Sequence, residues 1–361
     1  MPTQIESHHN QDVLSISSVT SPLFSYHVQI MVPLKQQRKR SLVAATMALL
    51  ISSMASPSTC FSSPKIPSGS RTSSTSASSI LLRATTTEKT NPSSQTSSDL
   101  PDDVKIVSCM PDPLPSSLRH DYYLLRHGQS TANVASIISS ARRNAYSERH
   151  GLTPVGYEQG AAAATALVEA LERNGSVKKG DKVMFVASPF ARAKQTAEAC
   201  LAELLQNQEL QNRLEALGLT LAQDNIEDII LKDKLMERYF GKLDNEAIYT
   251  YAYVWPVDKF NVTHTAFNVE SVAAVCTRIR ELIVDDLEQS LNDGGDQKYH
   301  VVLTSHADVL QITQLYAAGA ENVGAFSSYR FGNGEVRAMA RTPDSLPEPA
   351  PLEAPKRGTQ T

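Results

Sequence analysis

The chain contains 361 residues, which is enough for one large domain or two ordinary ones. Its formal net charge of −4 at pH 7 is only slightly acidic, so the charge balance gives no sign of a nucleic-acid partner. The four cysteines have no metal-ligand spacing, and we interpret them as reduced thiols rather than a disulfide framework: Cys60, Cys109, Cys200 and Cys276.

Composition divides the chain into three parts. About half of residues 61–98 are Ser or Thr, and such a segment cannot bury enough apolar surface to offset the entropy of ordering. We therefore interpret residues 1–118 as a disordered or targeting region, and the Pro-rich residues 342–361 as a disordered tail. Residues 119–341 are left as a single domain of ordinary size.

The N-terminal region has the order of features found in a signal peptide. A basic cluster at residues 35–40 precedes an apolar run at residues 42–55, and small residues follow. The run is too short for a stable membrane span. Because the basic cluster begins well inside the chain, translation starting at Met31 rather than Met1 is our hypothesis for the initiation site.

Phe61 then opens a Ser/Thr-rich segment without an acidic residue before Glu88. This arrangement resembles the bipartite presequence of algae with secondary plastids, in which a signal peptide precedes a phenylalanine-led transit peptide. The resemblance implies a plastid location. The alternative is a disordered tail with a chance apolar patch on a cytoplasmic protein.

The rest of the chain alternates strand and helix patterns. Strands are predicted within residues 121–128, 181–190, 227–241, 298–306 and 334–341, the last with the alternation of an edge strand. Helices are predicted within residues 152–175, 190–206, 269–291 and 307–316. Thr153 suits the N-cap of the first helix, Pro154 its first turn, and Gly175 its end. This alternation predicts an α/β sheet with parallel strands.

Three of the strand-like runs end in polar residues: Arg126-His127-Gly128, Ser188-Pro189 with Arg192 shortly after, and Ser305-His306-Ala307. In open α/β sheets, ligands bind beyond the carboxyl ends of the strands, where helix N-termini also point. Two arginines and two histidines could therefore meet at one place. The alternative is that each lies alone at the surface.

Taken in order, these motifs resemble those of the histidine phosphatase superfamily, also called phosphoglycerate mutase-like. "RHGQSTAN" is similar to the opening signature of the family, and "LTPVGYEQG", "SPFARAKQTAE", "LMERYFG", "VESVAAVCTRI" and "LTSHADV" are similar to its later blocks. The positions carried over are Arg126, His127, Gly128, Asn133, Leu152, Thr153, Gly156, Arg192, Glu237, Glu270, Ser271 and His306. Gln129, Val269 and Ala307 depart from the common pattern, but none of them replaces a charged catalytic group.

The resemblance implies a three-layer α/β sandwich over residues 119–341, with a mostly parallel sheet, helices on both faces and an antiparallel edge strand. It also implies transfer of a phosphoryl group. That reaction needs a nucleophile, an anion clamp and an acid for the leaving oxygen. Neutral His127 is the candidate nucleophile, and Glu237 the candidate acid that later activates water. No metal or other cofactor is expected, because cationic side chains can supply the charge.

The candidate phosphate ligands are Arg126, Arg192, protonated His306 and the amide of Asn133, and the supporting residues are Gly128, Thr153, Ser188 and Glu270, with Ser271. We interpret Arg142, Arg143 and Arg149 as a solvated basic stretch rather than as substrate contacts. The aromatic residues Tyr249, Tyr251, Tyr253 and Trp255 are expected to pack a lid against the core, with substrate contact as the alternative.

The predicted function is hydrolysis of a phosphomonoester, either a small phosphorylated metabolite or a phosphoprotein. A phosphoglycerate mutase is the alternative, but residues 242–268 offer only Lys242, Lys259 and His264 as cations for a second anionic group. A non-catalytic binding module is the third possibility. The expected partner is a phosphorylated substrate, and the sequence leaves the oligomeric state and the identity of the substrate open.

Overall fold

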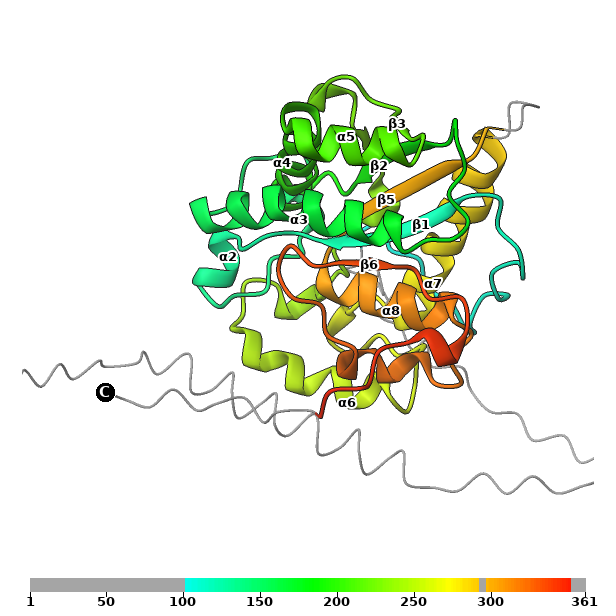
Figure 1. Ribbon diagram of the computed structural model, residues 1–361. Helices are drawn as coiled ribbons and strands as arrows, with labels where there is room; N and C mark the ends of the chain where they lie inside the picture. Colours follow the sequence, from blue (N-terminus) through cyan, green and yellow to red (C-terminus); the bar gives the residue numbers. More distant parts are fainter. Residues whose placement is uncertain (1–100, 292–296, 352–361) are drawn as a thin grey trace, which may run out of the picture. The chain divides into compact units, whose positions relative to one another are not determined.

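The computed structural model describes residues 101–291 and 297–351 (Figure 1). Residues 1–100 of the predicted disordered or targeting region and residues 352–361 of the tail lie outside the described residues. The structure is built on one sheet whose strands are β1 (Asp121–Arg126), β2 (Lys182–Ala187), β3 (Thr220–Leu221), β4 (Ile230–Leu231), β5 (Tyr299–Ser305) and β6 (Val336–Ala338).

The sheet has the order β3-β2-β5-β1-β6, and β4 also pairs with β2. Every pair is parallel except β1 with β6, so the parallel sheet and the edge strand are both confirmed. Arg126 pairs with Ser305 across β1 and β5, and Ala187 pairs with Thr304 across β2 and β5. The carboxyl ends of these three strands therefore lie level with one another.

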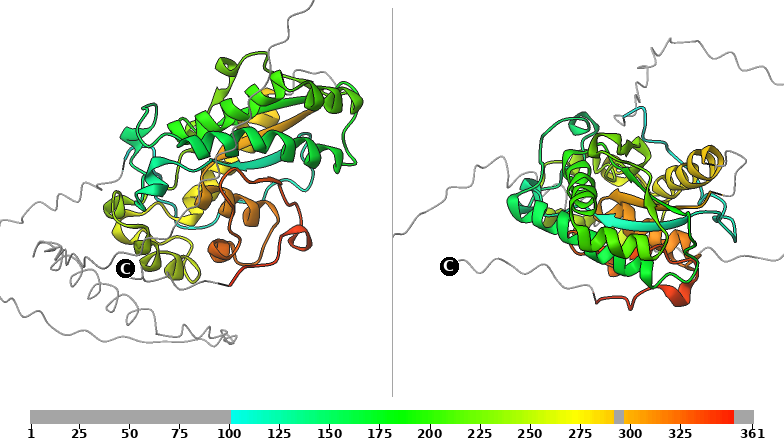
Figure 2. Two further views of the ribbon diagram at one scale, coloured as in Figure 1. Left: turned by 60° about the vertical axis from the view of Figure 1, so that its left-hand side comes forward. Right: turned by 45° about the horizontal axis from the view of Figure 1, so that its top comes forward.

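Helices cover both faces of the sheet (Figures 1 and 2). On one side lie α3 (Pro154–Glu172), α4 (Ala191–Gln206) and α5 (Gln208–Ala216), and on the other lie α7 (Val272–Arg280) and α8 (Ala307–Ala317). The predicted helix over residues 269–291 is confirmed, but α7 continues as a π-helix, η7 (Glu281–Glu288). The two short helices are α2 (Thr131–Val134) and α6 (Trp255–Asp258).

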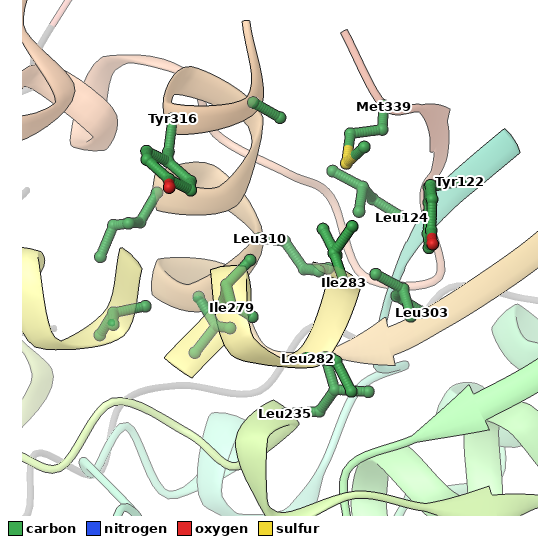
Figure 3. Packing of buried hydrophobic residues seen from close by; sticks show 14 of the residues in the cluster. Tyr122, Leu124, Leu235, Ile279, Leu282, Ile283, Leu303, Leu310, Tyr316 and Met339 are labelled. Atoms are coloured by element: carbon green, nitrogen blue, oxygen red, sulfur yellow. The ribbon is translucent and has the colours of Figure 1, made fainter. Parts of the chain in front are cut away.

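Alternation of side chains along β1 divides the apolar interior into two cores. Tyr122 and Leu124 point into the core under α7 and α8, part of which Figure 3 shows, and Tyr123 and Leu125 point into the core under α3 and α4. All four are 4% exposed or less. Because β1 is buried on both faces, its end is held rigidly where the chain continues into His127.

Short 3-10 turns occur before α3 and before β4, make up much of the chain between β4 and α7, and recur at the C-terminal end. They are η1 (Arg142–Asn144), η2 (Ile226–Asp228), η3 (Asp233–Leu235), η4 (Gly241–Leu243), η5 (Ile248–Tyr253), η6 (Ala266–Asn268), η8 (Val323–Ser328) and η9 (Pro343–Ser345). No helix among residues 101–291 and 297–351 is both long and apolar enough to cross a membrane. Cys109, Cys200 and Cys276 are free thiols, as predicted.

The predicted start of α3 is confirmed, and its predicted end is wrong. The Thr153 hydroxyl accepts a hydrogen bond from the Gly156 N–H at 3.2 Å, and Pro154 is the first helical residue. The helix ends at Glu172 and Arg173 caps it in an ordinary right-handed conformation, so Gly175 lies beyond the cap. A glycine is not needed here because the chain leaves the helix without adopting positive φ at the cap.

Packing extends on both sides beyond residues 119–341. Val104 and Leu114 are buried, and the Tyr316 hydroxyl donates to the carbonyl oxygen of Asp112. At the other end, the N–H of Ala350 donates to the carbonyl oxygen of Ser328 at 2.8 Å. Residues 101–118 and 342–351 thus contact the domain, although their composition predicts disorder.

Candidate active site

The structure brings the three polar strand ends together. His127 follows β1, Ser188 follows β2, and His306 follows β5 as the N-cap of α8. Arg192, in the first turn of α4, places Nε 3.3 Å from His127 Nε2. The rings of His127 and His306 lie edge to face with centroids 5.2 Å apart, so one cluster contains both histidines.

His127 is held as a neutral imidazole. Its ring is 3% exposed, and burial together with the charges of Arg192 and Arg126 lowers its pKa well below 6.5. Nδ1 lies 2.7 Å from the carbonyl oxygen of Gly128, which can only accept a hydrogen bond, so the proton is on Nδ1. The lone pair is therefore on Nε2, which faces Arg192.

The loop after His127 is fixed by a close backbone approach. A Cβ at Gly128 would collide with the carbonyl oxygen of Gly156, and the N–H of Gly128 donates to Thr196 Oγ1 at 2.9 Å. Thr153 Oγ1 donates to Gln129 Oε1 at 2.8 Å, which ties the start of α3 to the same loop. Thr153 and Gly128 therefore both fix the backbone next to His127.

Arg192 is 3% exposed and approaches both candidate reacting groups. Its Nη2 donates to the carbonyl oxygen of Ser139 at 2.8 Å and lies 3.8 Å from Glu237 Oε2. Its Nη1 is buried and has no hydrogen-bond partner among the described residues. A buried guanidinium nitrogen with an unused donor is suited to an anionic oxygen.

Arg126 and Asn133 are also arranged as donors. Arg126 Nη1 donates to the carbonyl oxygen of Phe331 at 2.6 Å, which fixes the guanidinium, and its buried Nε is unpartnered within the described parts of the chain. Ser130 is the N-cap of α2, and the amide oxygen of Asn133, at the third helical position, accepts from the N–H of Ser130 at 3.0 Å. The amide NH2 of Asn133 is not used in this cap.

Glu237 lies between Arg192 and His306, with Oε2 3.7 Å from His306 Nδ1. Its other oxygen accepts from the N–H of Arg238 at 2.9 Å. Burial raises the pKa of Glu237, and the charge of Arg192 opposes the rise. Burial thus favours the protonated carboxyl group that the predicted acid needs.

His306 differs from the expectation in its charge. Burial and the charges of Arg192 and its neighbours lower the pKa of His306 well below 6.5, so the ring is neutral rather than protonated. Ser188, predicted as a supporting residue, places its Oγ 2.9 Å from His306 Nε2. His306 Nδ1 has no hydrogen-bond partner among residues 101–291 and 297–351.

The expectation of a solvated basic stretch is wrong for Arg142. Its side chain is 11% exposed, its Nη1 donates to the carbonyl oxygen of Glu237 at 2.5 Å, and its Nη2 lies 3.2 Å from Glu270. Arg143 and Arg149 are exposed, as predicted. Arg142 was misassigned because its carboxylate partners are distant in sequence.

Glu270, predicted as a supporting residue, forms buried ion pairs. Its carboxylate binds Arg278 at 2.8 Å and Arg142 at 3.2 Å, and it accepts from the N–H of Tyr239 at 3.1 Å. Although burial opposes it, the charge of Arg278, followed by that of Arg142, lowers the pKa of Glu270 to about 2. Ser271 caps α7, its hydroxyl accepting from the N–H of Ala274 at 3.1 Å.

The aromatic segment packs as predicted and also borders the site. Tyr251 stacks on Trp255 with centroids 4.6 Å apart and contacts Phe240 edge to face at 4.9 Å. Burial, followed by the charges of Glu237 and Asp308, raises the pKa of Tyr251 well above its ordinary value. Tyr249, by contrast, is 40% exposed.

A buried polar network next to Glu237 was not predicted. Arg238 forms a bidentate ion pair with Asp258 at 2.7 and 2.8 Å, and His264 Nε2 lies 2.7 Å from the same carboxylate. Trp255 Nε1 donates to Asp308 Oδ2 at 3.1 Å, and Asp308 lies 3.5 Å from Arg238. The sequence contains only a weak indication of this network, because an arginine directly after the candidate acid does not reveal that its carboxylate partner lies 20 residues away.

Replacing Asp308 by asparagine should reduce the loss of stability that occurs as pH rises from 5 to 8. Burial raises the pKa of Asp308 to about 7, above that of an aspartate in the unfolded chain. Between the two values the folded state holds a proton that the unfolded state releases, so stability falls as pH rises through this window. The free energy of unfolding of Asp308→Asn, relative to that of the wild type, should therefore increase by about 2 kcal/mol from pH 5 to pH 8.

The measurement is urea unfolding of both proteins at pH 5 and pH 8. Asp285→Asn, which changes an exposed aspartate in η7, is the matched control and should differ from the wild type equally at both pH values. A difference between Asp308→Asn and the wild type that does not change with pH would rule out this titration.

Comparison with known protein families matches the first part of the described chain. Residues 122–219 match the model of the Histidine phosphatase superfamily (branch 1). No curated protein matches the chain significantly.

Similar solved structures include a mycobacterial glucosyl-3-phosphoglycerate phosphatase, with 20% identity, a TM-score of 0.38, and coverage of 60% of this chain and 88% of that chain. A phosphoserine phosphatase from Entamoeba histolytica has 15% identity, a TM-score of 0.41, and coverage of 60% and 88%. The alpha-ribazole phosphatase from Shigella flexneri has 19% identity, a TM-score of 0.39, and coverage of 65% and 100%.

Proposed function

We propose that this chain is a phosphomonoester hydrolase of the histidine phosphatase superfamily that works through a phosphohistidine on His127. The observation that carries the proposal is the state of His127. Its neutral ring is fixed through Nδ1 by the carbonyl oxygen of Gly128, and its Nε2 lies 3.3 Å from the Arg192 guanidinium. A nucleophilic lone pair and an anion-binding group therefore meet at one point.

In the first step, His127 Nε2 attacks the phosphorus atom, and the bond between phosphorus and the ester oxygen breaks. The carboxyl group of Glu237 gives its proton to the leaving oxygen and becomes a carboxylate. Arg126, Arg192 and Asn133 donate to the phosphoryl oxygens. A bound phosphate dianion also favours protonation of His306, because an opposite charge nearby raises its pKa.

In the second step, the Glu237 carboxylate takes a proton from a water molecule whose oxygen attacks the phosphorus atom. The bond between phosphorus and Nε2 breaks, inorganic phosphate leaves, and both His127 and Glu237 return to their starting states. Arg142 and Glu270 contribute by position, since Arg142 binds both the backbone of Glu237 and the carboxylate of Glu270.

The positions of the three cations considered for a second anionic group favour a hydrolase over a mutase. His264 is buried against Asp258, and Lys242 and Lys259 are exposed. His264 is therefore already paired with a carboxylate, and the two exposed lysines are not part of the buried cluster around His127. The charge of Arg238 is likewise neutralised by its own carboxylate partner, Asp258.

The test is a comparison of two activities of the purified full chain. Release of inorganic phosphate is measured with aryl phosphates, sugar phosphates, phosphoserine and phosphopeptides, and interconversion of phosphoglycerates is measured with 2,3-bisphosphoglycerate present. We expect phosphate release to be the faster reaction. Faster interconversion would make the protein a mutase, and the absence of both reactions would favour a non-catalytic module. We also propose that the protein is located in the plastid, as the resemblance of its N-terminal region to a bipartite presequence implies.

A further inference from the structure

A cavity of about 790 Å³ lies at the end of the sheet opposite to the candidate active site. Residues 121–123, at the amino end of β1, line this cavity, whereas His127 follows the carboxyl end of the same strand. A six-residue strand spans about 20 Å. The other walls come from the end of α3, from α8, from the chain before β1, and from β6 and the residues after it (Figure 1).

Three residues in the cavity wall carry buried nitrogen donors that have no hydrogen-bond partner among the described residues. They are His120 Nε2, Gln314 Nε2 and Arg341 Nη1. His120 is 2% exposed and Gln314 is 1% exposed. Leaving a buried donor unsatisfied costs about 1–3 kcal/mol, so three such groups in one wall call for an acceptor that the described residues do not supply.

The orientation of the first two groups identifies them as donors. The N–H of Tyr299 donates to His120 Nδ1 at 3.2 Å, and burial lowers the pKa of His120, so the neutral ring carries its proton on Nε2. Arg337 Nη1 donates to Gln314 Oε1 at 3.5 Å, which leaves the Gln314 NH2 group as the open end of the amide.

The lining of the cavity is also positively charged. Arg173, Arg337 and Arg341 line it, and Asp121 is the one carboxylate among the described lining residues. The Asp121 carboxylate is already bound by Lys298 at 2.9 Å and by the hydroxyl of Ser176. Of the three arginines, Arg337 is paired with Glu335 at 2.5 Å and Arg173 lies 3.9 Å from Glu169. Arg341 and the unpartnered N–H groups are therefore what the wall offers to an anionic oxygen.

We propose that this cavity is a second ligand site, separate from the phosphoryl-transfer site, that binds a small metabolite through a carboxylate or phosphate group. Arg341, Gln314 and His120 supply the directed donors. Arg173, whose side chain is 71% exposed at the end of α3, supplies charge at the rim. The proposal does not depend on the hydrolase activity, because binding at this site involves none of the groups around His127.

The experiment measures thermal unfolding of the full chain carrying Arg192→Gln, which weakens anion binding at the candidate active site. Inorganic phosphate and succinate are the two probes, each at constant ionic strength in chloride. We expect a saturable rise in Tm with at least one of them, because a ligand that binds only the folded state stabilises it. Phosphate alone, succinate alone or both would define the group that the site prefers.

The decisive comparison is between two variants on the Arg192→Gln background. Adding Arg173→Gln and Arg341→Gln should weaken the apparent affinity by at least about tenfold, and adding Arg213→Gln should leave it unchanged. Arg213 is the matched control because it lies on α5 and pairs with Glu172 outside the cavity. Should the variant lacking both cavity arginines fail to fold, Arg173→Gln alone replaces it.

An equal rise in Tm in the cavity variant and the control would show a general salt effect or residual binding at the active site, and would overturn the proposal. No rise with either probe would overturn it as well. Both outcomes are independent of the proposed hydrolase activity. Every variant compared already carries Arg192→Gln, so the loss of activity is common to all of them.

Discussion

Replacing His127 by alanine should lower the rate of phosphate release by about 10⁴-fold or more, because the variant lacks the only group proposed to form a bond to phosphorus. The anion-binding groups around the site remain, so inorganic phosphate should still bind with an affinity within about tenfold of the wild type. The variant therefore separates bond formation from anion binding. The measurements are steady-state rates with 4-nitrophenyl phosphate and inhibition by inorganic phosphate.

Arg192→Ala provides the contrasting variant. Its loss removes the buried guanidinium next to His127 Nε2, so it should weaken phosphate binding as well as slow the reaction. Denaturing the wild type in alkali during turnover with labelled substrate should trap a phosphohistidine that is absent from His127→Ala. Equal hydrolysis by the wild type and His127→Ala would contradict the assignment of the nucleophile.

The strand ends were predictable because their chemistry is local in sequence. Each motif places its polar residues directly after an apolar run, and a parallel sheet brings such ends to the same edge. The register of Arg126 with Ser305 and of Ala187 with Thr304 realises this arrangement. Position along the strand was therefore enough to predict that His127 and His306 meet.

What the sequence could not reveal depends on contacts between distant residues. Arg142 belongs to a basic stretch that suggests solvent exposure, and only the folded chain brings Glu270 to within 3.2 Å of it. The charge of His306 is a similar case. Its neutrality results from full burial beside Arg192, and neither the depth of a side chain nor the sum of neighbouring charges can be obtained from a motif.

Local signals were also missed where they were short. The helix α5 begins after Asn207, whose side-chain oxygen accepts from the N–H groups of Glu209 and Leu210. Leu210 and Leu214 then form its buried face at helical spacing. The segment follows α4 directly, and its polar composition continues that of the end of α4. Nine residues also contain too few helical turns for a 3.6-residue repeat of apolar side chains to be recognised.

Replacing Glu237 by glutamine should have an effect that depends on the leaving group. Glutamine keeps a side-chain oxygen that can accept the hydrogen bond from the N–H of Arg238. It can neither donate a proton to the leaving oxygen nor accept one from water. With an alkyl phosphate, whose leaving oxygen needs a proton, the rate should fall by about 10²–10⁴-fold. With 4-nitrophenyl phosphate the first step should be nearly preserved, because nitrophenolate leaves without protonation.

The second step still needs Glu237 as a base, and this difference makes the variant informative. Glu237→Gln should release a burst of nitrophenolate equal to the amount of enzyme, followed by slow turnover, because the phosphohistidine forms but is not hydrolysed. Glu227→Gln, which changes an exposed glutamate in η2, should behave as the wild type. Equal losses with both substrates and no burst would make Glu237 a positioning residue instead.

The pH profile of the wild type provides an independent check on the same assignment. The low pKa of His127 keeps the nucleophile unprotonated below pH 6.5, so kcat/KM for an alkyl phosphate should not fall as pH decreases through that value. The raised pKa of Glu237 extends the range in which its carboxyl group is protonated, and kcat/KM should fall as pH rises above it. Glu237→Gln should lose this alkaline limb, because the group whose ionisation causes it is no longer present.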